Sequence, residues 1–232
     1  MHEANSINDL YDILDRLTDG VDWNDFYARR AMPAPFLVHS TLPDKAVTQF
    51  VRTHDIKSAV EFGCGEGRNA IFLARNGVDV LALDSSQVAV ENARSAAQNT
   101  GENLAAHLDF VAADCLAFDY KGRTFDLALD SGLFHHLAPH RRLQYRDLLG
   151  KVLNPGGFFV LLCFAANAGG ADEADDLGFY LHRNTGVAFT EQRIRDFFGA
   201  DFQIVSIEKC AQSVTDDYID IPFLFSCIMQ KK

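Results

Sequence analysis

Long apolar runs, signal-like segments and paired cysteines are all missing from this sequence. No apolar run approaches the roughly 18 residues of a membrane-spanning helix. The N-terminus, MHEANSINDLYDILDRL, is polar and acidic, whereas a secretory signal is basic and then apolar. The five cysteines are odd in number and include no Cys-X-X-Cys pair, which argues against a disulfide framework or a zinc site. These absences predict a cytoplasmic protein with no membrane partner.

Positive charge is also scarce. The chain has 21 lysines and arginines against 32 aspartates and glutamates, which gives a net charge of −11. Because binding to a phosphate backbone relies on lysine and arginine, this balance favours a small-molecule partner over a nucleic acid. The local basic group of Arg141, Arg142 and Arg146 has the spacing of a solvated helix face. The 232 residues suffice for one core and demand no second domain, and we expect a monomer or a homodimer.

From residue 56 onwards, short apolar runs alternate with helical patterns, which is typical of a parallel sheet covered on both faces. Two later strand-like runs, 202–210 and 221–230, have only a polar loop between them and must be antiparallel. We therefore predict an α/β protein with a doubly wound, seven-stranded and mostly parallel sheet, an antiparallel C-terminal hairpin, and an N-terminal helical cap over residues 1–54. The expected parallel strands are 56–62, 78–84, 108–114, 124–130 and 157–164, and the expected helices are 68–77, 85–101 and 138–153.

The stretch EFGCGEGRN follows an expected strand and opens a helix. Its three glycines, Gly63, Gly65 and Gly67, permit positive φ and let a ligand approach the main chain closely, although any tight turn between strand and helix favours glycine. Asp84 ends the next strand, at the distance where an acid bonds both hydroxyls of a ribose. A nucleoside-containing ligand is therefore indicated.

Glu61, which precedes this loop, helps to distinguish between two such ligands, NAD and S-adenosylmethionine. The dinucleotide pattern Gly-X-Gly-X-X-Gly seats a pyrophosphate on the helix N-terminus. Here the spacing is Gly-X-Gly-X-Gly, and Glu61 precedes the loop. A carboxylate at that place would repel a diphosphate but suits a cationic amino group. The electrostatics favour S-adenosylmethionine over NAD.

In order along the chain, from about residue 56 to the C-terminus, these motifs resemble those of the class I S-adenosylmethionine-dependent methyltransferases. EFGCGEG is similar to the glycine-rich first motif, FDLALDSGLFHHL to the fourth-strand motif and LNPGGFFVLLCF to the fifth-strand motif. Arg68-Asn69 and the residues around them resemble the tellurite-resistance and thiopurine methyltransferase-like branch, which favours small substrates. The resemblance implies a Rossmann-like methyltransferase domain over residues 55–232. It also implies S-adenosylmethionine as cofactor and transfer of its methyl group to oxygen or sulfur, with nitrogen as a third option.

The resemblance also assigns residues to the cofactor. Asp114 stands where an acid commonly bonds the adenine amino group, with Cys115 and Leu116 beside the ring. Asp130 closes the fourth strand and could face the ammonium of the cofactor or a donor on the substrate, or be an ordinary strand-end acid. We expect the cofactor to contact Glu61, Gly63, Cys64, Gly65, Gly67, Arg68, Asn69, Asp84, Ser85, Asp114, Cys115, Leu116 and Asp130.

Two segments are candidates for the acceptor side. His135 or His136 could take a proton from the acceptor, or the pair could merely pack at the entry of a helix. Trp23, Phe26, Tyr27 and Arg30 could close over the cofactor as a lid that excludes water, or belong to a helix that packs on the sheet. Residues 165–190 should shape the acceptor pocket together with the N-terminal segment.

Motifs that are missing narrow the reaction further. DSGLF follows the fourth strand in place of the Asn/Asp-Pro-Pro-aromatic motif of enzymes that methylate exocyclic amines of DNA or amides of proteins. CFAAN ends the fifth strand without the second acid of magnesium-dependent catechol-type enzymes, so we predict no metal. Three alternatives stay open: a nicotinamide-dependent oxidoreductase, a non-catalytic module that binds S-adenosylmethionine, and a methyltransferase for protein or RNA.

Overall fold

A seven-stranded sheet forms the centre of the computed structural model, in the order β3-β2-β1-β4-β5-β9-β6. The structure describes residues 6–16, 21–29, 34–168 and 186–232. The strands of the sheet are β1 (Ser58–Phe62), β2 (Asp79–Asp84), β3 (Leu108–Ala112), β4 (Phe125–Ser131), β5 (Leu153–Phe164), β6 (Phe202–Lys209) and β9 (Leu224–Lys231). β1 to β5 pair in parallel, whereas β9 runs antiparallel to both β5 and β6. The predicted doubly wound sheet with its antiparallel C-terminal hairpin is confirmed.

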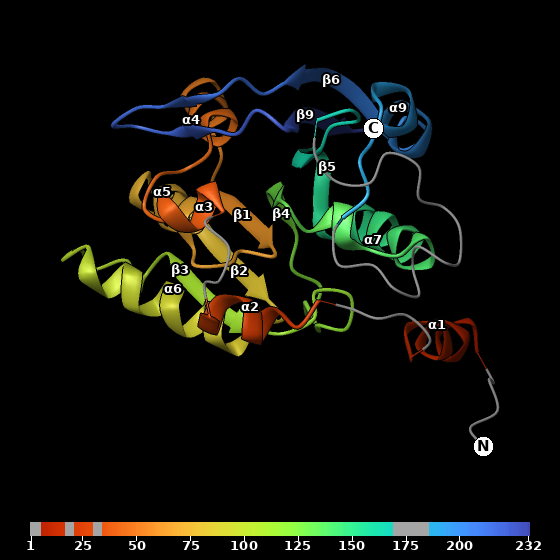
Figure 1. Ribbon diagram of the computed structural model, residues 1–232, viewed down its shortest axis with the longest axis horizontal. Helices are drawn as coiled ribbons and strands as arrows, with labels where there is room; N and C mark the ends of the chain where they lie inside the picture. The colour runs from red at the N-terminus through yellow and green to blue at the C-terminus, as the bar shows by residue number, and fades with distance from the viewer. Residues whose placement is uncertain (1–5, 17–20, 30–33, 169–185) are drawn as a thin grey trace.

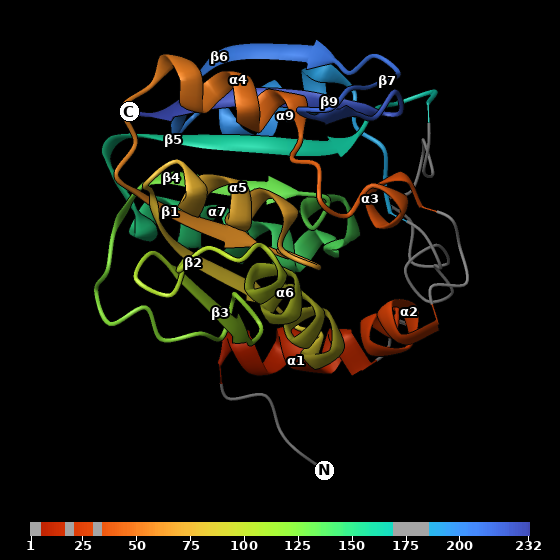
Figure 2. The same cartoon turned by 90° about the vertical axis from the view of Figure 1, so that its left-hand side faces the viewer.

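Helices cover both faces of this sheet (Figure 1, Figure 2). One face packs against α4 (Lys45–Thr53), α5 (Arg68–Arg75) and α6 (Gln87–Asn99), whose apolar side chains share a core with β1 and β2. The other face packs against α7 (Pro139–Val152) and α9 (Glu191–Phe198) around buried Tyr145 and Phe198. Burial on both faces explains why the strands lack a regular alternation of apolar and polar residues.

The remaining elements are short. Helices α1 (Ile7–Arg16), α2 (Trp23–Arg29) and α3 (Pro35–Val38) precede α4, and the 3₁₀ turn η1 (Phe134–His136) follows β4. A two-stranded ribbon, β7 (Ser213–Val214) with β8 (Ile219–Asp220), lies in the loop between β6 and β9. The sequence patterns predicted neither this ribbon nor α9. Figure 2 shows α2 and α3 beside the edge where β1 and β4 end.

The basic group on α7 differs from the expectation of a solvated face. Arg142 is buried, and its Nε donates to the carbonyl of Leu137 at 2.9 Å. Arg141 pairs with Asp12 and Asp15 of α1. These guanidinium groups serve internal contacts, so they do not form an exposed patch for phosphates.

Asp130, at the end of β4, organises the turn into η1. Its buried carboxylate accepts hydrogen bonds from the backbone N–H groups of Gly132, Leu133 and Phe134, and from the hydroxyl of Tyr145 at 2.7 Å. Burial raises the pKa of Asp130 to about 7, against the opposing effect of these donors. With its acceptor capacity used by four internal donors, Asp130 fixes the chain just before the two histidines.

Candidate functional site

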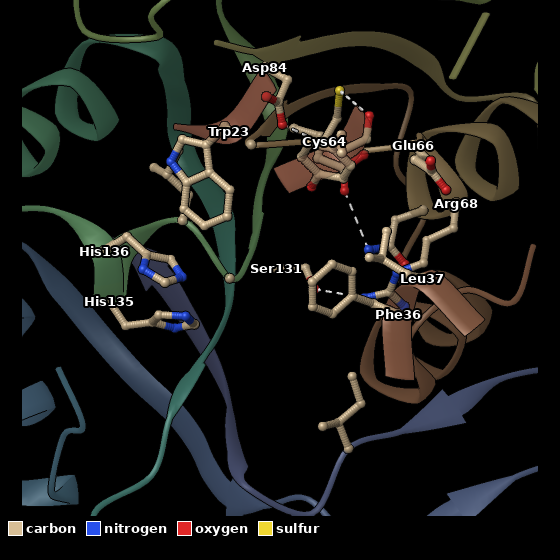
Figure 3. Close-up of a pocket in the computed structure, with 18 of the residues that line it drawn as sticks. Trp23, Phe36, Leu37, Cys64, Glu66, Arg68, Asp84, Ser131, His135 and His136 are labelled. Atoms are coloured by element: carbon tan, nitrogen blue, oxygen red, sulfur yellow. Dashed lines mark hydrogen bonds between the residues drawn. The ribbon is translucent and has the colours of Figure 1, made fainter. Parts of the chain in front are cut away.

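A cavity lies where β1, β2 and β4 end, at the edge where open α/β sheets usually bind ligands (Figure 3). The glycine loop after β1 forms one side of it. In Figure 3, Cys64, Glu66 and Arg68 lie on that side, and Trp23, His135 and His136 lie opposite. The lining consists of Trp23, Tyr27, Phe36, Leu37, Ser40, Glu61, Gly63, Cys64, Gly65, Glu66, Arg68, Asn69, Asp84, Ser85, Ser131, Gly132, Leu133, His135, His136, Leu137, Phe164, Ile221, Phe223 and Leu224.

All three loop glycines have positive φ, but a side chain added at each of them would meet different neighbours. A Cβ on Gly63 would lie 2.8 Å from Cβ of Leu133, and one on Gly67 would lie 2.6 Å from the ring of Phe110, so both positions are closed by packing. A Cβ on Gly65, where φ is +54°, would meet only the Tyr27 side chain, 2.6 Å from its hydroxyl oxygen. Gly65 is therefore the loop position at which bare backbone faces the cavity.

Asp84 holds this loop in place. Its Oδ2 accepts the N–H of Gly65 at 2.8 Å, and its Oδ1 accepts the N–H of Ser86, the N-cap of α6, at 2.8 Å. Burial raises the pKa of Asp84, and the two backbone donors oppose that rise. Each carboxylate oxygen can accept a second hydrogen bond. The side chain can thus support the loop and still bind a pair of hydroxyls.

Glu61 brings an incompletely paired carboxylate to the same cavity. It is 1% exposed, and its Oε1 accepts a hydrogen bond from Nδ2 of Asn69 at 3.3 Å. Its Oε2 is buried and has no hydrogen-bond partner among the residues that the structure describes. Burial raises the pKa of Glu61 to about 8, although Arg68 and Asn69 favour the charged form. A cationic donor in the cavity would satisfy Oε2 and stabilise the carboxylate.

Asp44 and Ser131 complete a buried polar network that the sequence reasoning missed. Both oxygens of Asp44 bind the guanidinium of Arg68, at 2.8 and 2.9 Å. The same carboxylate accepts Nδ2 of Asn69 at 2.9 Å and the hydroxyl of Ser131 at 2.6 Å. The charge of Arg68 is therefore balanced by the carboxylate of Asp44. Asp44 directly precedes a helix, a position so often used for capping that its sequence context gave no sign of this role.

The two histidines after β4 have different environments. His135 is buried, stacks on the ring of Phe164 at a centroid distance of 3.7 Å, and accepts the backbone N–H of Phe164 at Nδ1, 3.2 Å away. Burial, with smaller contributions from His136 and Arg142, lowers the pKa of His135 well below its usual value. His136 lies edge-on to Trp23 at 4.8 Å. Both rings line the cavity, as their candidate role requires.

Helix α2 contributes two of its aromatic residues to the lining, Trp23 and Tyr27. Phe26 instead packs behind them against Trp23 and Phe36. The side chain of Asn24 fixes the helix to the start of α6, because its Oδ1 accepts the Ser86 hydroxyl at 3.0 Å. Arg30 lies outside the described residues, as does most of the segment 165–190, from residue 169 to 185.

Five of the residues expected around the cofactor do not line this cavity. The side chain of Asp114 accepts the N–H of Leu116 at 2.9 Å and so closes its own turn. Cys115 is buried and its carbonyl accepts the Tyr120 hydroxyl, and Asp130 occupies the turn into η1. The other expected residues, from Glu61 to Ser85, are brought together apart from Gly67, which is closed off by Phe110. Within the described ranges, no group of three or more His, Cys, Asp and Glu side chains could hold a metal ion, and no helix is long and apolar enough to span a membrane.

The first comparison with known proteins concerns the stretch that builds the sheet edge and the glycine loop. Residues 59–157 match a family described as a methyltransferase domain. This stretch of the chain is thus similar to a methyltransferase domain. The match begins inside β1 and ends in β5, so the matched stretch includes Asp84 and the two histidines.

Individual relatives differ in what they methylate. A 2-heptyl-1-hydroxyquinolin-4(1H)-one methyltransferase of Mycobacteroides abscessus is 31% identical over 106 residues, which are 45% of this chain and 45% of that protein. A tRNA (carboxymethyluridine(34)-5-O)-methyltransferase of Saccharomyces cerevisiae is 32% identical over 131 residues, 55% of this chain and 43% of that protein. The chain thus spans about half the length of the curated relatives it matches.

A solved structure supports the fold over the whole chain. The 1,6-didemethyltoxoflavin-N1-methyltransferase of Burkholderia thailandensis, crystallised with 1,6-didemethyltoxoflavin and S-adenosylhomocysteine, superposes with a TM-score of 0.69 at 20% identity. The superposition covers 100% of this chain and 93% of that one. At this identity the likeness concerns the fold.

Because Asp44 is buried in this network, we expect the protein to lose more stability when Asp44 is neutralised than when the acid of a surface ion pair is. Asp44→Asn should lower the free energy of unfolding by about 3 kcal/mol, because it leaves the charge of Arg68 buried without its partner. Asp25→Asn is the matched control: Asp25 pairs with Arg29 at the surface, where the two side chains are 45% and 72% exposed, and its loss should cost less than about 0.5 kcal/mol. Urea titration measures both values, and equal effects would contradict the network's role.

Proposed function

We propose that this chain transfers the methyl group of S-adenosylmethionine to an oxygen, sulfur or nitrogen atom of a small molecule. The observation that carries the proposal is the buried, unpartnered Oε2 of Glu61 beside a glycine loop held by Asp84. The proposal keeps residues 55–232 as the catalytic domain and residues 1–54 as a cap that adds Trp23 and Tyr27 to the cavity.

The residues present fit the cofactor group by group. Glu61 offers a carboxylate to an ammonium, Asp84 offers two oxygens to the ribose hydroxyls, and the main chain at Gly65 can be approached closely. A nicotinamide dinucleotide fits less well. Its diphosphate would face Glu61, while Arg68, the one arginine among the described residues of the lining, already binds Asp44 with both terminal nitrogens.

The rest of the lining supports catalysis in preference to binding alone. Trp23, His136, Phe164 and Phe223 also line the cavity, and these rings would form an apolar and aromatic compartment for an acceptor. When bound, S-adenosylmethionine supplies a methyl group on a positively charged sulfur, and the acceptor's lone pair takes that methyl while the electron pair of the carbon–sulfur bond stays on sulfur. The side chains of this compartment can orient an acceptor and exclude water, which is a large part of what such a transfer needs.

The relatives also bear on the acceptor. The 2-heptyl-1-hydroxyquinolin-4(1H)-one methyltransferase and the 1,6-didemethyltoxoflavin-N1-methyltransferase are named for small heteroaromatic acceptors. The yeast relative acts on tRNA, but a net charge of −11 and the internal pairing of Arg141 and Arg142 weigh against an RNA partner here. A small, mostly apolar acceptor agrees best with the aromatic compartment.

The number of protons released on ligand binding provides a first test of the proposal that Glu61 binds the ammonium group. Because the pKa of Glu61 is about 8, its carboxyl is mostly protonated at neutral pH. An ammonium bound beside it would favour the charged form, so binding should release a proton, and affinity should rise as pH increases from about 6 to about 8. Calorimetric titration with S-adenosylhomocysteine, in buffers of different ionisation enthalpy, measures the number of protons released.

Glu61→Gln should abolish both the proton release and the pH dependence. Glu66→Gln is the matched control, since Glu66 lines the same cavity but already accepts a hydrogen bond from Asn92 at 2.9 Å. Proton release that is equal in the wild type and in Glu61→Gln would contradict the assignment.

The glycine loop gives a second test. Gly65→Ala should weaken S-adenosylhomocysteine binding at least tenfold, because the added methyl enters the cavity and displaces the Tyr27 hydroxyl. Gly77→Ala separates this effect from backbone strain: Gly77 also has positive φ, +79°, but a Cβ there meets nothing within 4 Å. Both variants should lose about 1 kcal/mol of stability from the left-handed backbone, and only the first should lose the ligand. Equal affinities would place the ligand elsewhere.

The activity itself is tested by a screen with labelled S-adenosylmethionine over small phenols, hydroxyheteroarenes, thiols, carboxylates and amines. Transfer of label to one class supports the proposal. Two results would replace it. Binding of S-adenosylhomocysteine without transfer to any class indicates a binding module, and greater thermal stabilisation by NAD than by S-adenosylmethionine at equal concentration indicates an oxidoreductase.

A further inference from the structure

His135 lines the cavity, and one of its two ring nitrogens is committed to the backbone. Near the end of β5, the backbone N–H of Phe164 donates to Nδ1 of His135 at 3.2 Å. The carbonyl of His135 in turn accepts the N–H of Val187 at 2.8 Å. Stacking on the Phe164 ring at 3.7 Å sets the plane of the imidazole. The ring is therefore held from two sides, by a hydrogen bond along its edge and by an aromatic face.

This geometry determines where the imidazole proton sits. A nitrogen that accepts a backbone N–H must carry a lone pair, so Nδ1 is unprotonated. A neutral imidazole then carries its hydrogen on Nε2. The ring is 3% exposed, which favours the neutral form over the imidazolium. His135 consequently has no lone pair left with which to accept a proton from an acceptor molecule.

The remaining nitrogen, Nε2, has no hydrogen-bond partner in the part of the chain that the structure describes, although the ring lines the cavity. A Cβ on Gly186 would collide with Cδ2 and the carbonyl oxygen of His135, so a larger residue there would push the ring out of place. A donor that is fixed this firmly and left unpaired in an apolar compartment favours a ligand with an acceptor atom at that point.

We propose that His135 donates its Nε2–H to an oxygen or unprotonated ring nitrogen of a planar, apolar acceptor molecule and does not act as the base. This inference rests on the proposed function and names its substrate class: hydroxylated heteroarenes, whose conjugate base spreads its charge over ring and oxygen. The flat rings of Trp23, Phe164 and Phe223 suit such a shape. The donor stabilises negative charge on the oxygen or nitrogen it contacts, which makes loss of the acceptor's proton to another group or to water easier.

Nitrogen NMR tests the tautomer directly, without turnover. In protein labelled with ¹⁵N-histidine, His135→Asn identifies the resonances of His135 by their disappearance, and His107→Asn, at a surface histidine paired with Asp79, is the matched control. The expected result is a neutral ring with hydrogen on Nε2 from about pH 5 to about pH 8. A ring with hydrogen on Nδ1, or one that titrates within that range, would overturn the inference.

The ligand is tested with two probes of the same two-ring shape, in the presence of S-adenosylhomocysteine. 4-Hydroxyquinoline carries the oxygen and nitrogen that a donor can bind, and naphthalene carries neither. 4-Hydroxyquinoline should shift the Nε2 resonance of His135 and naphthalene should not, and His135→Asn should weaken 4-hydroxyquinoline alone, by about tenfold. The Asn side chain can still accept the Phe164 N–H, so the fold should be kept.

The outcomes separate this inference from the proposed function. Absence of S-adenosylhomocysteine binding, measured on the same sample by calorimetry, contradicts the proposed function but leaves the tautomer result to be judged by itself. Binding of S-adenosylhomocysteine together with an unshifted Nε2 resonance, or with equal loss of both probes in His135→Asn, contradicts the role of His135 as a donor to the acceptor molecule.

Discussion

The buried carboxylate of Asp44 is the constraint on which the cavity depends. It receives hydrogen bonds from Arg68, Asn69 and Ser131, so it joins the start of α4, the first turn of α5 and the end of β4. An unpaired guanidinium at this depth would cost several kcal/mol, and only an equally buried acid removes that cost. The consequence is electrostatic as well as structural. Once Arg68 is balanced, the unsatisfied acceptor that remains buried next to the loop is Oε2 of Glu61, and the site favours a cation there.

The two ends of the cavity present opposite hydrogen-bonding groups, acceptors at the glycine loop and a donor at His135. At the glycine loop, acceptor oxygens remain available: Oε2 of Glu61 has no donor among the described residues, and Asp84 has lone pairs left beyond its two backbone partners. At the far end His135 presents a donor, because its other nitrogen is occupied by the Phe164 N–H. The site would favour one ligand that is cationic near Glu61 and a second ligand that is electron-rich near His135. Transfer of a methyl cation equivalent requires such a pair, an electron-poor donor and an electron-rich acceptor.

How far the sequence predicts this arrangement depends on the range of the interactions. The alternation of strands and helices, the C-terminal hairpin and the glycine loop are local patterns, and they predicted the sheet and the position of the cavity edge. The role of Asp44 depends on Arg68, 24 positions along the chain. The role of Asp130 depends on the fold of the turn that follows it and on the hydroxyl of Tyr145, 15 positions along. No spacing rule distinguishes an acid at a strand end that faces a ligand from one that caps the following turn. Asp130 does the second, with three backbone donors on one carboxylate.

The same limit applies to His135, and here the decisive partner is not even a side chain. The dipeptide His135-His136 predicted imidazoles near the acceptor, and both rings line the cavity. Whether such a ring is a base or a donor depends on which nitrogen is free. That is decided by the backbone N–H of Phe164, near the end of a strand 29 positions along the chain. A pattern of residue types carries no information about that amide, whereas the register of β5 against η1 does. The chemical role of His135 thus depends on its contact with the end of β5 as much as on its being a histidine.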